Sequence, residues 1–172
     1  MLSETADGYK TNMTGQYDVI VLGGGTAGVI AAVQAGRAGV RTLLVEKSAA
    51  LGGTTTTAGV NFPGLFHAWG QQIIAGIGWE LVRSCVEECG GTLPDFTHYK
   101  QPHHRLQIRV NPHMYSALCN EAVVQSGTDI LLHTMVANLK KRSNDGWQAD
   151  LCAKEGIIHC NSRVVIDDTC DP

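Results

Sequence analysis

Three glycines form the stretch of this sequence whose types and spacing point most directly to chemistry. Gly23, Gly25 and Gly28 follow an apolar run at residues 19–22 in the spacing G-x-G-x-x-G and open a helix-forming segment. In such a context the first glycine permits a tight turn, the second lets a pyrophosphate approach the backbone, and the third lets the helix pack against the strand. Free amides at the helix start then face the phosphates, aided by the helix dipole. The spacing predicts a dinucleotide-binding loop.

Glu46 adds a ribose-binding group to this loop. It ends a second apolar run, residues 42–45, about 20 residues beyond the glycines, where an acid accepts hydrogen bonds from ribose hydroxyls. The same charge would repel a 2′-phosphate, which disfavours NADP. A glycine-rich turn without any ligand is the alternative, and the combination of strand, spacing, helix and acid argues against it. NAD and FAD remain open at this point.

A strand, a helix and a second parallel strand are needed to hold these residues. The β-branched run 19–22 suits a strand buried on both faces, residues 26–38 suit a helix that packs closely, and Gly39 is placed to end it. Beyond residues 42–45 we expect a loop over 47–70, a helix over 71–89, an irregular stretch over 92–105, a short strand over 106–110 and a helix over 112–126 with Asn111 as its N-cap. The chain then predicts a strand over 130–139, an antiparallel meander of 135–142, 147–153 and 157–161, and a last strand over 164–167.

The loop after Glu46 favours FAD over NAD. Glu46-Lys47 followed by Leu51-Gly52-Gly53-Thr54, together with GGGTAGVIAA, RVNPHMY and LLHTMV, resembles the FAD-dependent oxidoreductase family of the two-dinucleotide-binding-domain flavoproteins. The resemblance covers nearly all of residues 17–171. It implies an α/β, Rossmann-like FAD-binding domain with a parallel sheet and an antiparallel β-meander, and hydride transfer between a flavin and a small organic substrate.

The resemblance also implies roles for individual positions. The predicted diphosphate contacts are Gly23, Gly25, Thr26, Ala27 and Gly28. Glu46 is expected to bind the adenosine ribose, and the backbone of Val136 the adenine edge. The residues expected to line the approach to the ribityl chain are Lys47, Gly52, Gly53 and Thr54.

The family's Asp-Ala-Thr-Gly-Asp segment is matched by residues 167–171, Asp-Asp-Thr-Cys-Asp, with Thr169 as a further predicted cofactor contact. Cys170 stands where the family has a glycine, which tolerates positive φ and close backbone approach far better than cysteine does. Family members also continue beyond this point. We therefore expect a truncated domain, whose flavin site is completed by a missing C-terminal part or by a partner chain.

His67 is the candidate for catalysis, because it lies in the loop expected to face the flavin and histidine titrates near neutral pH. The alternative is a loop histidine bonded to backbone or water. His98, His103 and His104 lack an acidic or cysteine partner at ligand spacing, so no metal site is predicted. Cys85 and Cys89 fall on the apolar stripe of the helix expected over 71–89 and are expected to be buried, inert thiols.

Length and composition fit one domain without a nucleic-acid partner. The chain has 172 residues, a net charge of −3 and a pI of about 6.1, so it has no basic footprint. Residues 1–16 are expected to be a disordered tail and 17–172 the domain, with 60–110 as an inserted loop and helix. The sequence has no membrane-spanning run and no signal peptide, and none of its six cysteines forms a C-x-x-C pair, so a cytoplasmic protein with reduced thiols is expected. An NAD-binding module and a cofactor-free remnant or partner subunit remain the alternatives.

Overall fold

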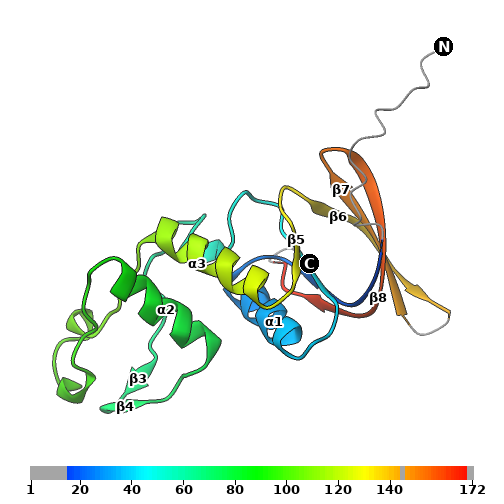
Figure 1. Cartoon of the computed structure of the whole chain (residues 1–172). Helices are drawn as coiled ribbons and strands as arrows, with labels where there is room; N and C mark the ends of the chain where they lie inside the picture. The colour runs from blue at the N-terminus through cyan, green and yellow to red at the C-terminus, as the bar shows by residue number, and fades with distance from the viewer. Residues whose placement is uncertain (1–14, 144–145, 170–172) are drawn as a thin grey trace.

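A computed structural model describes residues 15–143 and 146–169 and contains one six-stranded sheet beside a group of helices (Figure 1). The strand order is β5-β2-β1-β8-β7-β6. The first four strands run parallel, and β7 and β6 continue the sheet antiparallel. Their bounds are β1 Gln16–Leu22, β2 Thr42–Val45, β5 Asp129–Leu131, β6 Met135–Arg142, β7 Gly146–Ala153 and β8 Gly156–Asp167. The predicted α/β Rossmann-like architecture with a meander is confirmed.

Strand β8 joins the meander to the parallel part of the sheet. Its first half pairs antiparallel with β7, while its second half pairs parallel with β1 as far as the Leu22–Asp167 register. The prediction of two separate strands over 157–161 and 164–167 is therefore wrong. The polar residues Asn161 and Ser162 do not interrupt the ladder, because the hydrogen bonds of a strand come from the backbone and not from apolar side chains.

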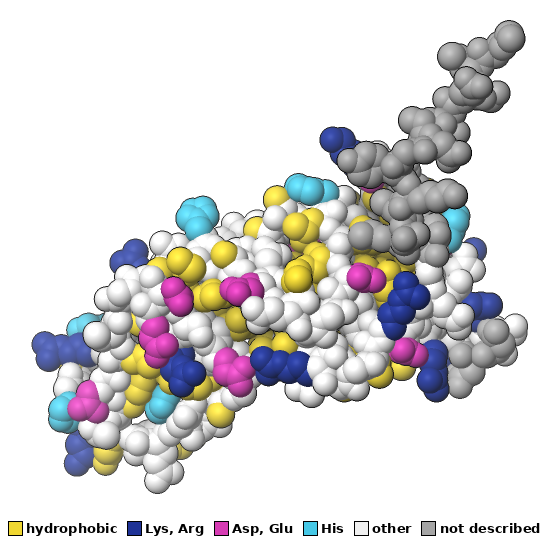
Figure 2. Space-filling view, in the orientation of Figure 1, with side chains coloured by type: hydrophobic (Ala, Val, Ile, Leu, Met, Phe, Trp, Pro, Cys, Tyr) yellow, Lys and Arg dark blue, Asp and Glu magenta, His cyan; other side chains and the backbone are white. Residues whose placement is uncertain are grey.

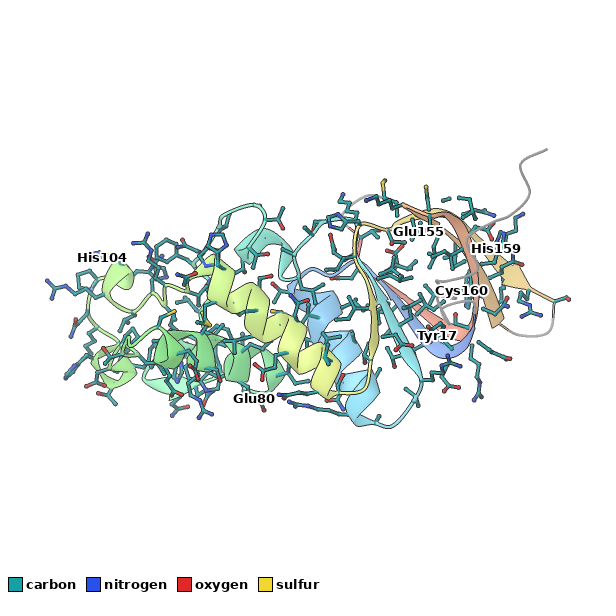
Figure 3. All side chains as sticks on the ribbon, turned by 45° about the horizontal axis from the view of Figure 1, so that its top comes forward. Tyr17, Glu80, His104, Glu155, His159 and Cys160 are labelled. Carbon is teal, nitrogen blue, oxygen red and sulfur yellow. The ribbon has the colours of Figure 1, made fainter. Side chains whose placement is uncertain are left out.

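Two apolar cores lie on the two faces of the parallel strands. On one face, side chains such as Val21 and Leu44 pack with Val29 of α1 (Thr26–Arg37) and with α2 (Ile77–Glu88) and α3 (Pro112–Gln125). The other face is covered by the curled meander. The core between them includes Tyr17 of β1 and Cys160 of β8, which Figure 3 labels at that end of the molecule. All four residues of β2 are buried, as expected for a parallel strand covered on both sides.

Gly36 lies inside α1, where glycine disfavours a helix. A Cβ at this position would lie 2.5 Å from the Ser126 Oγ and 2.6 Å from the Thr128 Oγ1. The bare backbone therefore lets α1 approach the segment between α3 and β5 closely.

The start of α3 and the end of α1 follow the predicted signals. The Asn111 side-chain oxygen accepts hydrogen bonds from the His113 and Met114 amides at 3.0 and 3.2 Å. Gly39, just past α1, has a φ of +79°. The strand β1 begins at Gln16, one residue inside the segment expected to be a tail, and residues 1–14 of that segment lie outside the described residues.

The segment between β2 and α3 differs most from prediction. The helix expected over 71–89 begins only at Ile77, because Gly76 precedes it with a φ of +83°, and Gln71–Gln72 forms β4, which pairs with β3 (His67–Ala68). No strand forms over 106–110, although Ile108 and Val110 are buried in the helical core. Short 3₁₀ turns occur at η1 (Gly53–Thr55), η2 (Phe96–His98) and η3 (His103–Arg105).

The strand expected over 130–139 is also interrupted. β5 ends at Leu131 and β6 begins at Met135, and between them His133 takes a φ of +52°. The amides of His133 and Thr134 bond to the carbonyls of Ser48 and Glu46. This bend turns the chain from the parallel sheet into the meander. Within the described residues, none of the helices has the length and apolar character needed to cross a membrane.

Candidate cofactor-binding site

The glycine loop lies at the carboxyl end of β1 and leads directly into α1. Gly23 has a φ of +99°, and a Cβ there would lie 2.6 Å from the Asp168 carbonyl. Gly25 is the N-cap of α1, and its carbonyl accepts the first helical hydrogen bond, from Val29, at 2.9 Å. A Cβ at Gly28 would collide with the Gly23 carbonyl. The spacing thus produces the tight turn and the close helix packing that the sequence predicts.

Glu46 lies directly after β2 and is 9% exposed. One carboxylate oxygen accepts a hydrogen bond from the Gly24 amide at 2.6 Å, and the other accepts one from the Ser48 amide at 2.7 Å. Each oxygen of an ionised carboxylate can accept a second hydrogen bond. The acid therefore ties the glycine loop to the end of β2 and retains acceptor capacity for a pair of ribose hydroxyls.

A cavity of about 560 Å³ opens at the carboxyl ends of β1, β2 and β8. Its wall contains seven of the predicted contacts, namely Gly23, Gly25, Glu46, Lys47, Gly53, Val136 and Thr169. Carboxyl ends of parallel strands are where open α/β sheets bind ligands. Residues far apart in the sequence thus meet at one place.

The other predicted contacts do not line this cavity but lie in the same loops; they are Thr26, Ala27, Gly28, Gly52 and Thr54. The Gly52 amide donates to the Gly24 carbonyl at 2.8 Å, and its own carbonyl accepts from the Thr26 hydroxyl at 3.3 Å. A Cβ at Gly53 would lie 2.9 Å from the Gly25 Cα. The segment after Glu46 is therefore packed against the glycine loop. Direct cofactor contacts by these five residues stay a prediction.

Several wall residues were not predicted as contacts. Thr134, Met135 and Leu139 come from the bend and from β6, and Ser48 and Thr57 come from the loop after Glu46. Thr134 lies two residues before Val136, which the sequence did predict as a contact. The bend at His133 that brings both residues to the cavity could not be predicted, because it contains no glycine or proline.

Two acids at the end of β8 complete the wall. Asp167 accepts hydrogen bonds from the Thr169 hydroxyl and amide at 2.7 and 3.0 Å, which lower the pKa of the Asp167 carboxyl. Asp168 extends in a different direction, and its Oδ2 accepts a hydrogen bond from the Gly28 amide at 2.7 Å. A carboxylate therefore lies at the N-terminus of α1. Cys170, the predicted departure from the family pattern, lies outside the described residues.

His67 lies in an aromatic cluster and not in the cavity wall. Its ring stacks on Phe96 with centroids 3.8 Å apart and meets Trp79 edge-on at 5.1 Å. The Nδ1 atom is buried, and burial lowers the pKa of the ring. The strand β3 that carries His67 lies at the far end of the molecule from the meander (Figure 1). A catalytic role for His67 stays a prediction, and this environment favours a neutral ring.

No disulfide is found among the described cysteines. Cys85 is buried as predicted, whereas Cys89 is exposed, because it is the C-cap residue of α2 and lies past its buried face. Burial raises the pKa of Cys85 and raises that of Cys119 to about 12. Across residues 15–143 and 146–169, no three His, Cys, Asp or Glu side chains converge to hold a metal ion. Figure 3 shows His104 at the end of the molecule opposite the meander.

Comparison with known families decides which dinucleotide this arrangement serves. The family model described as FAD dependent oxidoreductase matches residues 18–171. The chain belongs to this family. Its cofactor is FAD. The cavity wall contains Glu46, Gly25 and Val136, which were predicted to bind the adenosine ribose, the diphosphate and, through the backbone, the adenine edge; these individual roles stay predictions.

Relatives with established names match about a third of the chain. Dihydrolipoyl dehydrogenase of Trypanosoma brucei brucei is 47% identical over 53 residues, which are 30% of this chain and 11% of that protein. Nicotine dehydrogenase of Pseudomonas putida is 42% identical over 73 residues, 36% of this chain and 15% of that protein. These matches span only a small part of each relative.

Solved structures show the same fold over most of the chain. The myxobacterial chondrochloren halogenase CndH, described as an FAD-dependent halogenase, superposes with a TM-score of 0.63 at 16% identity, covering 88% of this chain and 37% of that one. The anhydrotetracycline hydroxylase OxyS of Streptomyces rimosus gives a TM-score of 0.60 at 18% identity, covering 91% and 32%. The chain thus spans about a third of these proteins' length.

Proposed function

We propose that this chain binds the adenosine diphosphate part of FAD in the cavity at the ends of β1, β2 and β8. The observation that carries the proposal is the convergence of the glycine loop, Glu46 and Val136 on one cavity of about 560 Å³. Glu46 would accept from the ribose hydroxyls, and the first-turn amides of α1 would donate to phosphate oxygens. Lys47 in the same wall would add a positive charge near the diphosphate.

We also propose that the whole protein transfers a hydride between the flavin and a small organic substrate. The bound flavin supplies that chemistry, while the protein supplies position and polarity. The described residues would fix the adenosine end of the cofactor. Their part in the reaction is thus to hold the cofactor in place.

A partner chain or a further domain is proposed to cover the flavin end. Large apolar side chains are exposed along the segment before α2, among them Phe62, Leu65 and Trp69 at 46%, 45% and 78%. Exposed apolar groups that lie close together mark interaction surfaces. They support a contact surface on this side of the molecule.

We propose a cytoplasmic location and no nucleic-acid or membrane partner. The net charge is −3, and acidic and basic side chains are interspersed on the face drawn in Figure 2. Binding to nucleic acid depends on a clustered positive charge. Cys85, Cys89, Cys119 and Cys152 form no disulfide, which supports a reducing compartment.

The test is direct titration of the purified chain with FAD, followed by flavin fluorescence and by the melting temperature. We expect saturable binding and a rise in melting temperature, as for any ligand that binds only the folded state. NADH is titrated in parallel, and the alternative of an NAD-binding module predicts binding of NADH in preference to FAD. A chain that binds neither would support the cofactor-free remnant and refute the proposal.

A further inference from the structure

Asp168 lies at the first turn of α1, beside glycines whose backbone carries no side chain. Its Oδ2 is 2.7 Å from the Gly28 amide. The same oxygen is 3.3 Å from the place a Cβ would take at Gly25, and among the described residues other than the chain neighbours of Gly25 it is the nearest atom to that place. The open space beside Gly25 is thus bordered by a carboxylate.

The amides of the first helical turn are the expected donors to a bound phosphate. The helix supplies no acceptor for the amides of Thr26, Ala27 and Gly28, because each lies within the first four positions. Such amides and the helix dipole favour any anion, a carboxylate as well as a phosphate. Asp168 already holds one of the three.

A bound diphosphate and the Asp168 carboxylate would compete for the same donors and would repel each other at this distance. Asp168 lies in the cavity wall together with Glu46 and Asp167, so the wall carries three acids before any anionic ligand enters. Glu46 accepts hydrogen bonds from the Gly24 and Ser48 amides, and Asp167 accepts them from Thr169, whereas the Gly28 amide donates to Asp168. The competition is therefore specific to Asp168.

We propose that Asp168 is an internal competitor of the cofactor's diphosphate. In the cofactor-free chain its carboxylate caps α1 and stabilises the folded state. Entry of a ligand with a diphosphate requires this side chain to leave the Gly28 amide, so Asp168 lowers the affinity for such ligands and leaves the affinity for adenosine unchanged. This inference rests on the proposed FAD site.

The experiment compares wild type with Asp168→Ala and Asp168→Asn in calorimetric titrations with FAD, ADP and adenosine. In wild type, ligand entry must break the charge-assisted hydrogen bond of Asp168, whereas Asp168→Ala has no such bond to break. Asp168→Ala should therefore bind FAD and ADP about tenfold more tightly. Asp168→Asn keeps the size and one acceptor oxygen but loses the charge, and should fall between the two. Adenosine has no phosphate, and its affinity should be the same in all three proteins.

Asp167→Asn is the matched control, because it removes one negative charge from the same wall without touching the Gly28 amide. An equal gain in Asp167→Asn would assign the effect to general charge and overturn the proposal. Equal FAD affinity in wild type and both Asp168 variants would also overturn it while leaving the FAD site intact. Failure of every protein to bind FAD and ADP would instead refute the proposed function itself.

Melting temperature gives a second readout that needs no flavin chemistry. Loss of the cap should lower the melting temperature of cofactor-free Asp168→Ala by about 2–4 °C. Saturating FAD should then raise that of Asp168→Ala by more than it raises that of wild type. A cofactor-free Asp168→Ala as stable as wild type would contradict the cap.

Discussion

Replacement of Glu46 by alanine should weaken both the fold and the cofactor site. The buried carboxylate joins the Gly24 amide at 2.6 Å to the Ser48 amide at 2.7 Å. Each hydrogen bond to a charged acceptor contributes about 1.5–3 kcal/mol. Water from the adjoining cavity can reach the vacated space, so we expect the lower end of the combined range, a loss of about 3 kcal/mol in the free energy of unfolding.

The loss corresponds to a drop in melting temperature of about 6–12 °C, at about 2–4 °C per kcal/mol for a chain of this size. Urea and thermal unfolding followed by circular dichroism measure it. Glu46→Gln has the same size and retains one acceptor oxygen, but its amide group faces a backbone donor, so it should be intermediate. Glu155→Gln, which changes an exposed acid in the turn between β7 and β8, serves as the control and should unfold like wild type.

FAD titration separates the two roles of Glu46. Loss of the ribose hydrogen bonds should lower FAD affinity by about tenfold or more. A free energy of unfolding for Glu46→Ala within about 0.5 kcal/mol of wild type would refute the link between the glycine loop and β2. Reduced stability with unchanged FAD affinity would keep that link and refute the ribose contact.

Three further predictions use other parts of the structure. Gly25→Ala should change the free energy of unfolding by less than about 1 kcal/mol, because among the described residues its Cβ would meet the Asp168 carboxylate at 3.3 Å and no closer atom. The same change should lower FAD affinity by about tenfold or more in a fluorescence titration. Hydrogen bonds, the largest from Asn138, lower the pKa of Asp150 to about 2, below its unfolded value of about 4. The ionised Asp150 therefore stabilises the fold above pH 4, and this stabilisation is lost as the pH falls towards 2. In Asp150→Asn the free energy of unfolding should depend less on pH in that window, as circular dichroism would measure. A thiol reagent should label exposed Cys89 quickly and buried Cys119, whose pKa is raised to about 12, only on unfolding, as peptide mass spectrometry would show.

Local sequence signals located the centre of the site well. The steric need for glycine at position 28 is local, because a Cβ there would collide with the Gly23 carbonyl five residues earlier. A Cβ at Gly23 or Gly25 would instead meet Asp168, far along the chain, and these two glycines were found through the spacing of the motif. The Asn111 cap is local in the same sense, since its side chain bonds amides two and three residues away. Such features depend on little beyond the segment itself, so the sequence alone can predict them.

Elements that depend on distant partners were predicted less well. His133 adopts a φ of +52° because its amide and that of Thr134 bond to the loop after β2, so an apolar run that looked like one strand becomes two. Ile108 and Val110 were expected in a strand, yet their side chains are buried without a ladder. In both places, contacts with segments far along the chain decide the backbone conformation. The local pattern of apolar residues therefore cannot predict it.

The Asp168 contact shows why a motif predicts the place of a dinucleotide site better than its affinity. The partners Asp168 and Gly28 are 140 residues apart in the sequence, and they meet only because β8 pairs in parallel with β1 up to the Leu22–Asp167 register. A shift of one residue in that register would turn Asp168 to the other face, since successive side chains of a strand alternate. The glycine loop supplies donors to any nearby anion. Which anion it holds, and how tightly FAD must bind to displace it, is therefore decided at the end of β8.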